Sequence, residues 1–140
     1  MPDIFQHFVI HAPVAQVFHG ISTPEGLDTW WTQRSSKHGN EFELAFGPTH
    51  QWRATVSRSV PDREFEIEIT HADADWTGTR MGFVLGESKG DTHVRFHHIG
   101  WPQSNDHYRI SCYCWAMYLR LLKRNVERGE VVPFEQRLEV

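Results

Sequence analysis

The segment 105–129, NDHYRISCYCWAMYLRLLKRNVERG, decides the fold. Apolar side chains recur in it every three or four residues, which gathers them on one face of an α-helix. The members of this stripe are Tyr108, Cys112, Trp115, Leu119, Leu122 and Val126. Gly129 predicts the end of the helix, because glycine readily takes the left-handed conformation found just past helix ends. A long helix with one apolar stripe needs a second layer to cover that stripe.

That second layer is predicted upstream, where the apolar period changes to two between Glu41 and Gly100. Alternation of this kind is typical of strands with one buried and one solvated face. The apolar sets are Phe42, Leu44 and Phe46; Trp52, Ala54, Val56 and Val60; Phe65, Ile67 and Ile69; Met81, Phe83 and Leu85; Val94 and Phe96. Arg58 is a charge on an apolar position, so we expect a bulge or a strand end near it.

The connections between these runs predict an antiparallel meander. Turn-forming residues separate the strands at Gly47-Pro48, at Pro61-Asp62-Arg63 and at Lys89-Gly90-Asp91. A further strand is predicted over 4–11, followed by a short helix over 14–21. A second short helix begins at Ser22-Thr23-Pro24-Glu25, where a hydroxyl can cap the free amides, and we expect it to end near 30–31.

These elements predict one α+β domain over residues 1–140. We expect a helix-grip fold, in which a curved antiparallel sheet of about six strands wraps around the long C-terminal helix. Two short helices follow the first strand. A strongly curved sheet leaves a gap in front of its helix, and either side chains or a ligand can fill that gap.

Charge and hydropathy argue against some classes of binding partner. The net charge is −4 and the basic residues are scattered, whereas nucleic-acid binding draws on clustered Lys and Arg. No nucleic-acid partner is therefore expected. No apolar run approaches the length of a membrane span, and polar residues interrupt the first segment, so neither a membrane span nor a secretory leader is predicted. We expect a cytoplasmic protein.

Metal and cofactor chemistry has no support in the residue spacings. Cys112 and Cys114 stand two apart in a helix and point to different faces, so they can neither bridge nor chelate one ion. His97 and His98 point to opposite faces of a strand. There is no zinc-binding helix motif, phosphate loop or dinucleotide fingerprint. No metal and no cofactor are expected.

Several segments resemble the START-like superfamily, also called SRPBCC or Bet v 1-like. They are Ile10-His11-Ala12-Pro13, Val17-Phe18, Thr23-Pro24-Glu25-Gly26-Leu27, Trp30-Trp31, Trp76-Thr77-Gly78-Thr79, the run from Thr92 to Trp101, and Trp115. Within it, the pattern is similar to the branch named after the C-terminal domain of the activator of Hsp90 ATPase. The resemblance implies a helix-grip fold over nearly the whole chain. Its members include lipid carriers, hormone receptors, polyketide cyclases, aromatases and co-chaperone domains.

The candidate site is the concave face of the sheet. The chain holds six Trp and nine Phe, a large aromatic content for a small core. His98 shares the inward parity of Val94 and Phe96, and the resembling family often has His at this place. It would either orient a ligand or act as a general base, or be a core histidine bonded to a neighbouring element. The other candidate ligand-binding residues are Trp30, Trp52, Phe83, Phe96, Trp101, Tyr108 and Trp115.

Trp52 and Trp101 lie near strand ends, so we expect them at a cavity mouth. The leading hypothesis for function is binding of a small hydrophobic or amphipathic molecule in an internal cavity, since only one inward titratable group is evident and catalysis by general acid and base needs two. The alternatives are a cofactor-independent enzyme of the polyketide cyclase or aromatase type and a stress-related, co-chaperone-like interaction module. Homodimer formation through an edge strand or the helical pair stays open.

Overall fold

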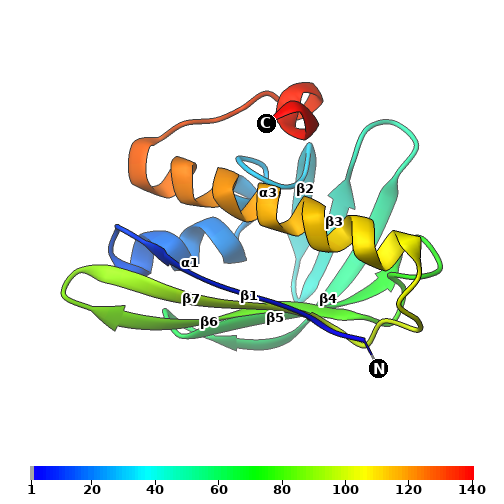
Figure 1. Cartoon of the computed structure of the whole chain (residues 1–140), viewed down its shortest axis with the longest axis horizontal. Helices are drawn as coiled ribbons and strands as arrows, with labels where there is room; N and C mark the ends of the chain where they lie inside the picture. Colours follow the sequence, from blue (N-terminus) through cyan, green and yellow to red (C-terminus); the bar gives the residue numbers. More distant parts are fainter. Residues whose placement is uncertain (1) are drawn as a thin grey trace.

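The computed structural model describes residues 2–140 (Figure 1). Its elements, in chain order, are β1 (Ile4–Ile10), α1 (Val14–Ser22), α2 (Pro24–Leu27), β2 (Arg34–His38), β3 (Glu41–Ala45), β4 (Gln51–Val60), β5 (Glu64–His71), β6 (Arg80–Ser88), β7 (Asp91–Ile99), α3 (Asp106–Arg128) and the 3₁₀ helix η1 (Phe134–Glu139). The strands form one antiparallel sheet in the order β1-β7-β6-β5-β4-β3-β2. The predicted α+β helix-grip fold is confirmed.

The sheet has seven strands instead of the expected six or so. The additional strand is β2, whose sequence RSSKH carries no apolar residue on either face. It lies at an edge of the sheet and pairs only with β3, and none of its five residues is buried, so neither of its faces contributes to the core. A strand of this kind has no hydrophobic alternation from which to predict it.

The long helix α3 lies across the concave face of the sheet (Figure 1). It begins where the side chain of Asn105 accepts a hydrogen bond from the backbone amide of Tyr108, at 3.0 Å. It ends at Gly129, whose φ of 70° is left-handed, as predicted. Both ends of the helix are therefore capped by residues immediately next to it.

The predicted apolar faces of the sheet and helix meet in one core. The buried members of the predicted set are Phe42, Leu44, Ile67, Ile69, Phe83, Leu85, Val94, Phe96, Trp115, Leu119 and Leu122. Tyr108 belongs to the same stripe and is half-buried. The pairing of β4 with β5 shifts register between Val56 and Arg58, which confirms the bulge expected at Arg58.

The second short helix ends earlier than predicted. It stops at Leu27, and the amides of Trp30, Trp31 and Thr32 all point at the Leu27 carbonyl, at 3.3, 2.9 and 3.1 Å. Trp30 and Trp31 are both buried. The chain leaves the helix before them, and these converging hydrogen bonds form the tight turn from which both indoles enter the core.

The C-terminal segment contains an unpredicted buried residue, Arg137, which is 3% exposed. Its guanidinium donates to the carbonyls of Asp28, Thr32 and Val132 at 2.8, 3.0 and 2.9 Å. These bonds fasten η1 to the connection between α2 and β2. An arginine near a chain end is normally expected in solvent, so the sequence pattern did not indicate this contact.

No helix within residues 2–140 is both long and apolar enough to span a membrane.

Trp115→Ala should lower the free energy of unfolding by about 3 to 5 kcal/mol, because it leaves a large cavity between α3 and the sheet. Denaturant titration measures the change. Tyr113→Ala is the matched control, because Tyr113 lies on the same helix and is 77% exposed. A loss below about 1 kcal/mol for Trp115→Ala would contradict its place in the core.

Candidate functional site

A directed chain of hydrogen bonds passes through His98, which is fully buried on β7. The indole N–H of Trp115 on α3 donates to His98 Nδ1 at 3.0 Å. An indole nitrogen can only donate, so the proton of the neutral imidazole lies on Nε2. That nitrogen donates to the Thr79 hydroxyl at 2.8 Å, and the hydroxyl donates to the Trp76 carbonyl at 2.6 Å.

The environment keeps this imidazole neutral. The pKa of His98 is lowered to about 3, chiefly by burial and to a smaller extent by the electrostatic effect of His97 and His107. Such a weak base does not accept a proton at neutral pH, which argues against general-base catalysis at this position. Both ring nitrogens already have protein partners. A ligand could bond to His98 only by displacing Trp115 or Thr79.

The predicted ligand-binding residues form one continuous aromatic cluster. Trp30, Phe83, Phe96, Trp101, Trp115 and His98 are buried, whereas Trp52 and Tyr108 are partly buried. The links run from Trp30 through Phe83 and Phe96 to Trp115, with ring centroids 4.6 to 6.2 Å apart. Trp76, which was not among the predicted ligand-binding residues, joins Trp52 to the others at 5.0 Å.

Two of these residues differ from expectation. Trp101 was expected at a cavity mouth but is fully buried, with its ring 5.6 Å from that of His107 and 5.4 Å from that of Tyr108. The Tyr108 hydroxyl donates to the carbonyl of Asp3 at 2.7 Å, so it bonds to the chain just before β1.

Little free space remains inside the cluster. A small pocket of about 30 Å³ is lined by Trp31, Trp76, Ser111, Cys114, Trp115 and Tyr118. That volume is on the scale of a water molecule and far below that of a typical ligand site. Large aromatic side chains therefore fill the gap between the curved sheet and α3.

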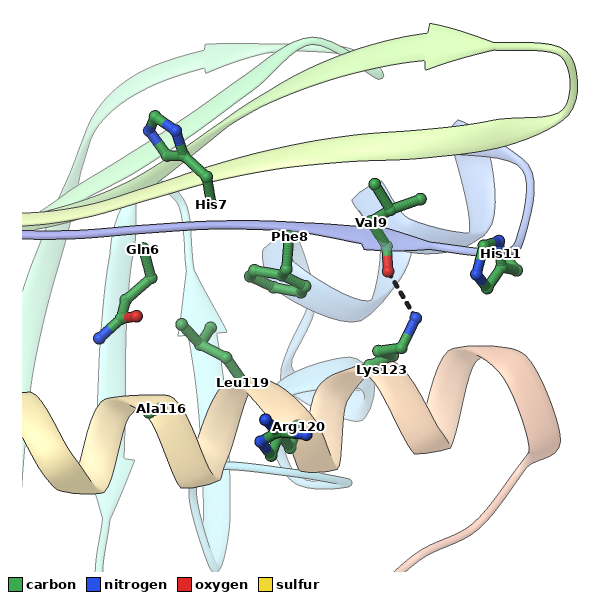
Figure 2. Close-up of a pocket in the computed structure, with 9 residues that line it drawn as sticks. All are labelled: Gln6, His7, Phe8, Val9, His11, Ala116, Leu119, Arg120 and Lys123. Atoms are coloured by element: carbon green, nitrogen blue, oxygen red, sulfur yellow. Dashed lines mark hydrogen bonds between the residues drawn. The ribbon is translucent and has the colours of Figure 1, made fainter.

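A larger space lies between the edge strand β1 and α3 (Figure 2). This groove has a volume of about 430 Å³, and we call it the β1–α3 groove. Its lining residues are Gln6, His7, Phe8, Val9, His11, Ala116, Leu119, Arg120 and Lys123. Figure 2 shows Gln6, Phe8 and Leu119 pointing into the space between strand and helix, while the side chains of His7 and Val9 project to the other side of β1.

The two cations of the groove have different surroundings. Lys123 Nζ donates to the Val9 carbonyl at 2.5 Å and lies 2.7 Å from a carboxylate oxygen of Glu127. Burial raises the pKa of Glu127, but hydrogen bonds from the His11 amide and from Lys123 outweigh it and hold that pKa below its usual value. The charge of Lys123 is thus matched by a carboxylate. Arg120 is exposed and forms no ion pair within residues 2–140.

The sequence patterns did not indicate this groove. Lys123 and Glu127 stand four residues apart, the spacing of a helical ion pair, and this was the one available local signal. The order of strands in the sheet makes β1 an edge strand. It also brings the Val9 carbonyl to Lys123, which is 114 positions away in the sequence.

Metal and thiol chemistry find little support in residues 2–140. No group of three or more His, Cys, Asp or Glu side chains there could hold a metal ion. Cys112 and Cys114 are free and partly buried, and burial raises the pKa of the Cys114 thiol. A raised pKa makes that thiol less reactive.

Stability should fall in mild acid because of His98. The unfolded chain binds a proton near pH 6.5 and the folded chain only near pH 3, so this contribution is complete above about pH 6.5 and is lost as pH falls toward about 3. From about pH 7.5 to about pH 5, His98 should remove about 2 kcal/mol of unfolding free energy.

In His98→Phe this part of the pH dependence should be absent. Its stability at about pH 7.5 should also be about 1 to 3 kcal/mol lower, because the Trp115 N–H loses its acceptor. His93→Phe, on the exposed face of the same strand, is the control. Parallel pH profiles for the wild type and His98→Phe in denaturant titrations would show that this account is wrong.

Comparison with known proteins agrees with the geometry. The family model described as "Activator of Hsp90 ATPase homolog 1-like protein" matches residues 11–127. No curated protein matches the chain. Among solved structures, the Aha1 dimer from Colwellia psychrerythraea is similar at 25% identity, with 93% of this chain and 99% of that chain covered and a TM-score of 0.82.

Two further structures share the fold. Protein MLL2253 from Mesorhizobium loti has 15% identity over 93% of this chain and 100% of that chain, with a TM-score of 0.79. DynU16, from the dynemicin biosynthetic locus, has 16% identity over 94% of this chain and 50% of that chain, with a TM-score of 0.74. The resemblance to the START-like superfamily is confirmed, and the chain belongs to the activator of Hsp90 ATPase homolog 1-like family.

Proposed function

We propose that this protein binds a small amphipathic molecule, with an apolar body and an acidic head group, in the β1–α3 groove. The observation that carries the proposal is a groove of about 430 Å³ with apolar walls beside the guanidinium of Arg120, which forms no ion pair within residues 2–140. This volume falls within the range of roughly 300 to 1,000 Å³ that is typical of small-molecule sites.

The walls of the groove suit an apolar body. Phe8 reaches in from β1, and Leu119 and Ala116 face it from α3. Phe8 and Ala116 are only partly buried in the protein alone, so a ligand would remove further apolar surface from water. The side-chain amide of Gln6 on β1 could contact a polar group of the ligand. Its hydrogen bond to the Cys112 carbonyl is long, at 3.5 Å.

The acidic head group is inferred from charge. Arg120 has no ion-pair partner in the part of the chain that the structure describes, and guanidinium groups bind carboxylates with two parallel hydrogen bonds. Lys123 stands one turn further along α3 and adds a second positive charge, although Glu127 compensates it in part. An anion would therefore be attracted to this edge of a molecule whose net charge is −4.

Binding without catalysis is the reading that the site favours. General acid–base chemistry needs two titratable groups in reach of the same substrate. The titratable side chains that line the groove are Arg120 and Lys123, which are ordinarily cations, and two histidines, His7 and His11. His7 projects to the other side of β1, and His11 Nδ1 lies 3.3 Å from a carboxylate oxygen of Asp91. His98 lies elsewhere, enclosed by its own partners. The cyclase and co-chaperone alternatives have no comparable observation in their favour.

Two further expectations stay predictions. The first is a homodimer, which the dimeric state of the Colwellia protein supports. The second is a cytoplasmic location. Native mass spectrometry of the purified chain would report the oligomer and any retained small molecule in one measurement.

The groove should bind 8-anilinonaphthalene-1-sulfonate, an aromatic body with an anionic group, saturably and at one molecule per chain. Arg120→Gln should weaken binding about tenfold, because a charged hydrogen bond to the sulfonate is lost. Ala116→Phe should abolish binding by filling the groove. Isothermal titration and probe fluorescence measure the affinity.

Arg109→Gln is the control, since Arg109 is an exposed arginine of the same helix outside the groove. Its affinity for the probe should equal that of the wild type. Near-ultraviolet circular dichroism should confirm that each variant is folded. Probe binding that survives both Arg120→Gln and Ala116→Phe unchanged would exclude the groove as the site.

A further inference from the structure

Two buried indole N–H groups have no hydrogen-bond partner within residues 2–140: those of Trp76 and Trp101. Trp76 is 7% exposed and Trp101 is fully buried. A buried donor without an acceptor is costly, and such groups are rare in folded proteins. Neither indole can help the other, because both nitrogens only donate.

The Trp76 ring lies within a shell of four other rings, which we call the aromatic cage. It stacks on Trp115 at 5.7 Å and 24°, and its centroid lies 5.0 Å from Trp52. Its other neighbours are His98 at 4.5 Å and Trp101 at 5.9 Å. The cage is thus shaped around a flat bicyclic aromatic ring. None of its members lines the β1–α3 groove.

Trp76 reaches the cage from a short turn that joins β5 to β6. The turn is held together internally, since the amides of Trp76 and Thr77 both donate to the Asp73 carbonyl at 3.0 Å. It ends at Gly78, whose φ of 90° is readily accessible only to glycine. The side chains that join this turn to the beginning of α3 are those of Asp75, Asn105 and His107.

Asp75 joins the turn to the beginning of α3 through two hydrogen bonds. One of its carboxylate oxygens accepts from Asn105 at 3.2 Å and from His107 at 3.0 Å. Opening would break these two bonds, withdraw the Trp76 ring and break the bond from the Thr79 hydroxyl to the Trp76 carbonyl, and the turn could then move away from α3. The hydrogen bonds that bind His98 to Trp115 and to the Thr79 hydroxyl do not involve the Trp76 ring.

We propose that the Trp76 ring is a built-in occupant of a second ligand site, and that a planar bicyclic aromatic molecule with a hydrogen-bond acceptor replaces it in the aromatic cage. The acceptor would bond to the N–H of Trp101. The displaced Trp76 N–H would then reach water. Replacement of the Trp76 ring by the ligand would thus give a hydrogen-bond acceptor to both indole N–H groups that lack one within residues 2–140. The ligand would stack on Trp115 where the Trp76 ring stacks in this structure.

Three probes of nearly equal size and shape test this chemistry. Quinoline carries an acceptor nitrogen, naphthalene carries no polar group, and indole carries a donor. Quinoline should bind saturably and about tenfold more tightly than naphthalene or indole, since a buried donor discriminates strongly for an acceptor. In ¹H–¹⁵N spectra, quinoline alone should move the Trp101 indole proton downfield. Equal affinities for the three probes would overturn the proposal.

Substitutions outside the cage test the exchange itself. Asp75→Ala should raise the affinity for quinoline about three- to tenfold, because it lowers the cost of opening the turn and leaves every cage ring in place. Asp106→Ala, which removes an exposed acid close to this contact, should have no effect. Unchanged quinoline affinity in Asp75→Ala would contradict the opening of the turn.

Substitutions inside the cage give a second readout. Trp76→Ala removes the competing ring and should bind quinoline at least tenfold more tightly than the wild type. Trp101→Phe should lose the preference for quinoline over naphthalene while retaining binding. The groove variant Ala116→Phe should bind quinoline as the wild type does, which separates this site from the β1–α3 groove. A folded Trp76→Ala that binds no quinoline would refute the proposal.

Discussion

The hydrogen bond from the Trp115 indole to His98 is the interaction on which the rest of the interior depends. It joins α3 to β7, the strand next to the β1 edge of the sheet, and both of its partners are buried. Because the indole can only donate, it also fixes the tautomer of the imidazole. The Nε2–H of His98 then donates to the Thr79 hydroxyl, and this hydroxyl donates to the Trp76 carbonyl in the turn between β5 and β6. One side chain of the helix is thereby linked to strand β7 and to the turn between β5 and β6.

This network explains why the interior holds so little free space. Both nitrogens of the His98 imidazole are hydrogen-bonded to the protein, and the indole rings of Trp76, Trp101 and Trp115 pack around it. Packing such large rings around a fixed centre fills the curved sheet. The β1–α3 groove, a space much larger than the pocket inside the cluster, lies where β1 ends the sheet and α3 passes beside it. A fold that can enclose a ligand thus offers in this chain a groove at its margin and an interior occupied by its own aromatic rings.

The candidate site could be predicted only in part. The inward parity of His98 placed it in the core, and the same parity argument placed Phe83 and Phe96 on the buried face of the sheet. Parity says which face of a strand a residue occupies, but it does not say which groups lie opposite. The choice between a ligand-orienting and a structural histidine therefore needed the positions of Trp115 and Thr79. Trp76 lies on a turn without any periodicity, so its place in the centre of the cluster had no local signal.

The sequence by itself determined the elements and their buried faces. The stripe of α3, the alternation of β3 to β7 and the helix end at Gly129 all follow from the fixed geometry of helix and strand, which acts over a few residues. Tertiary structure alone decided which of these faces meet. Arg137 finds the carbonyl of Asp28 across 109 positions, and Lys123 finds that of Val9 across 114. Such pairs depend on strand order, register and sheet curvature. These features result from many weak interactions along the whole chain, so no local sequence pattern indicates them.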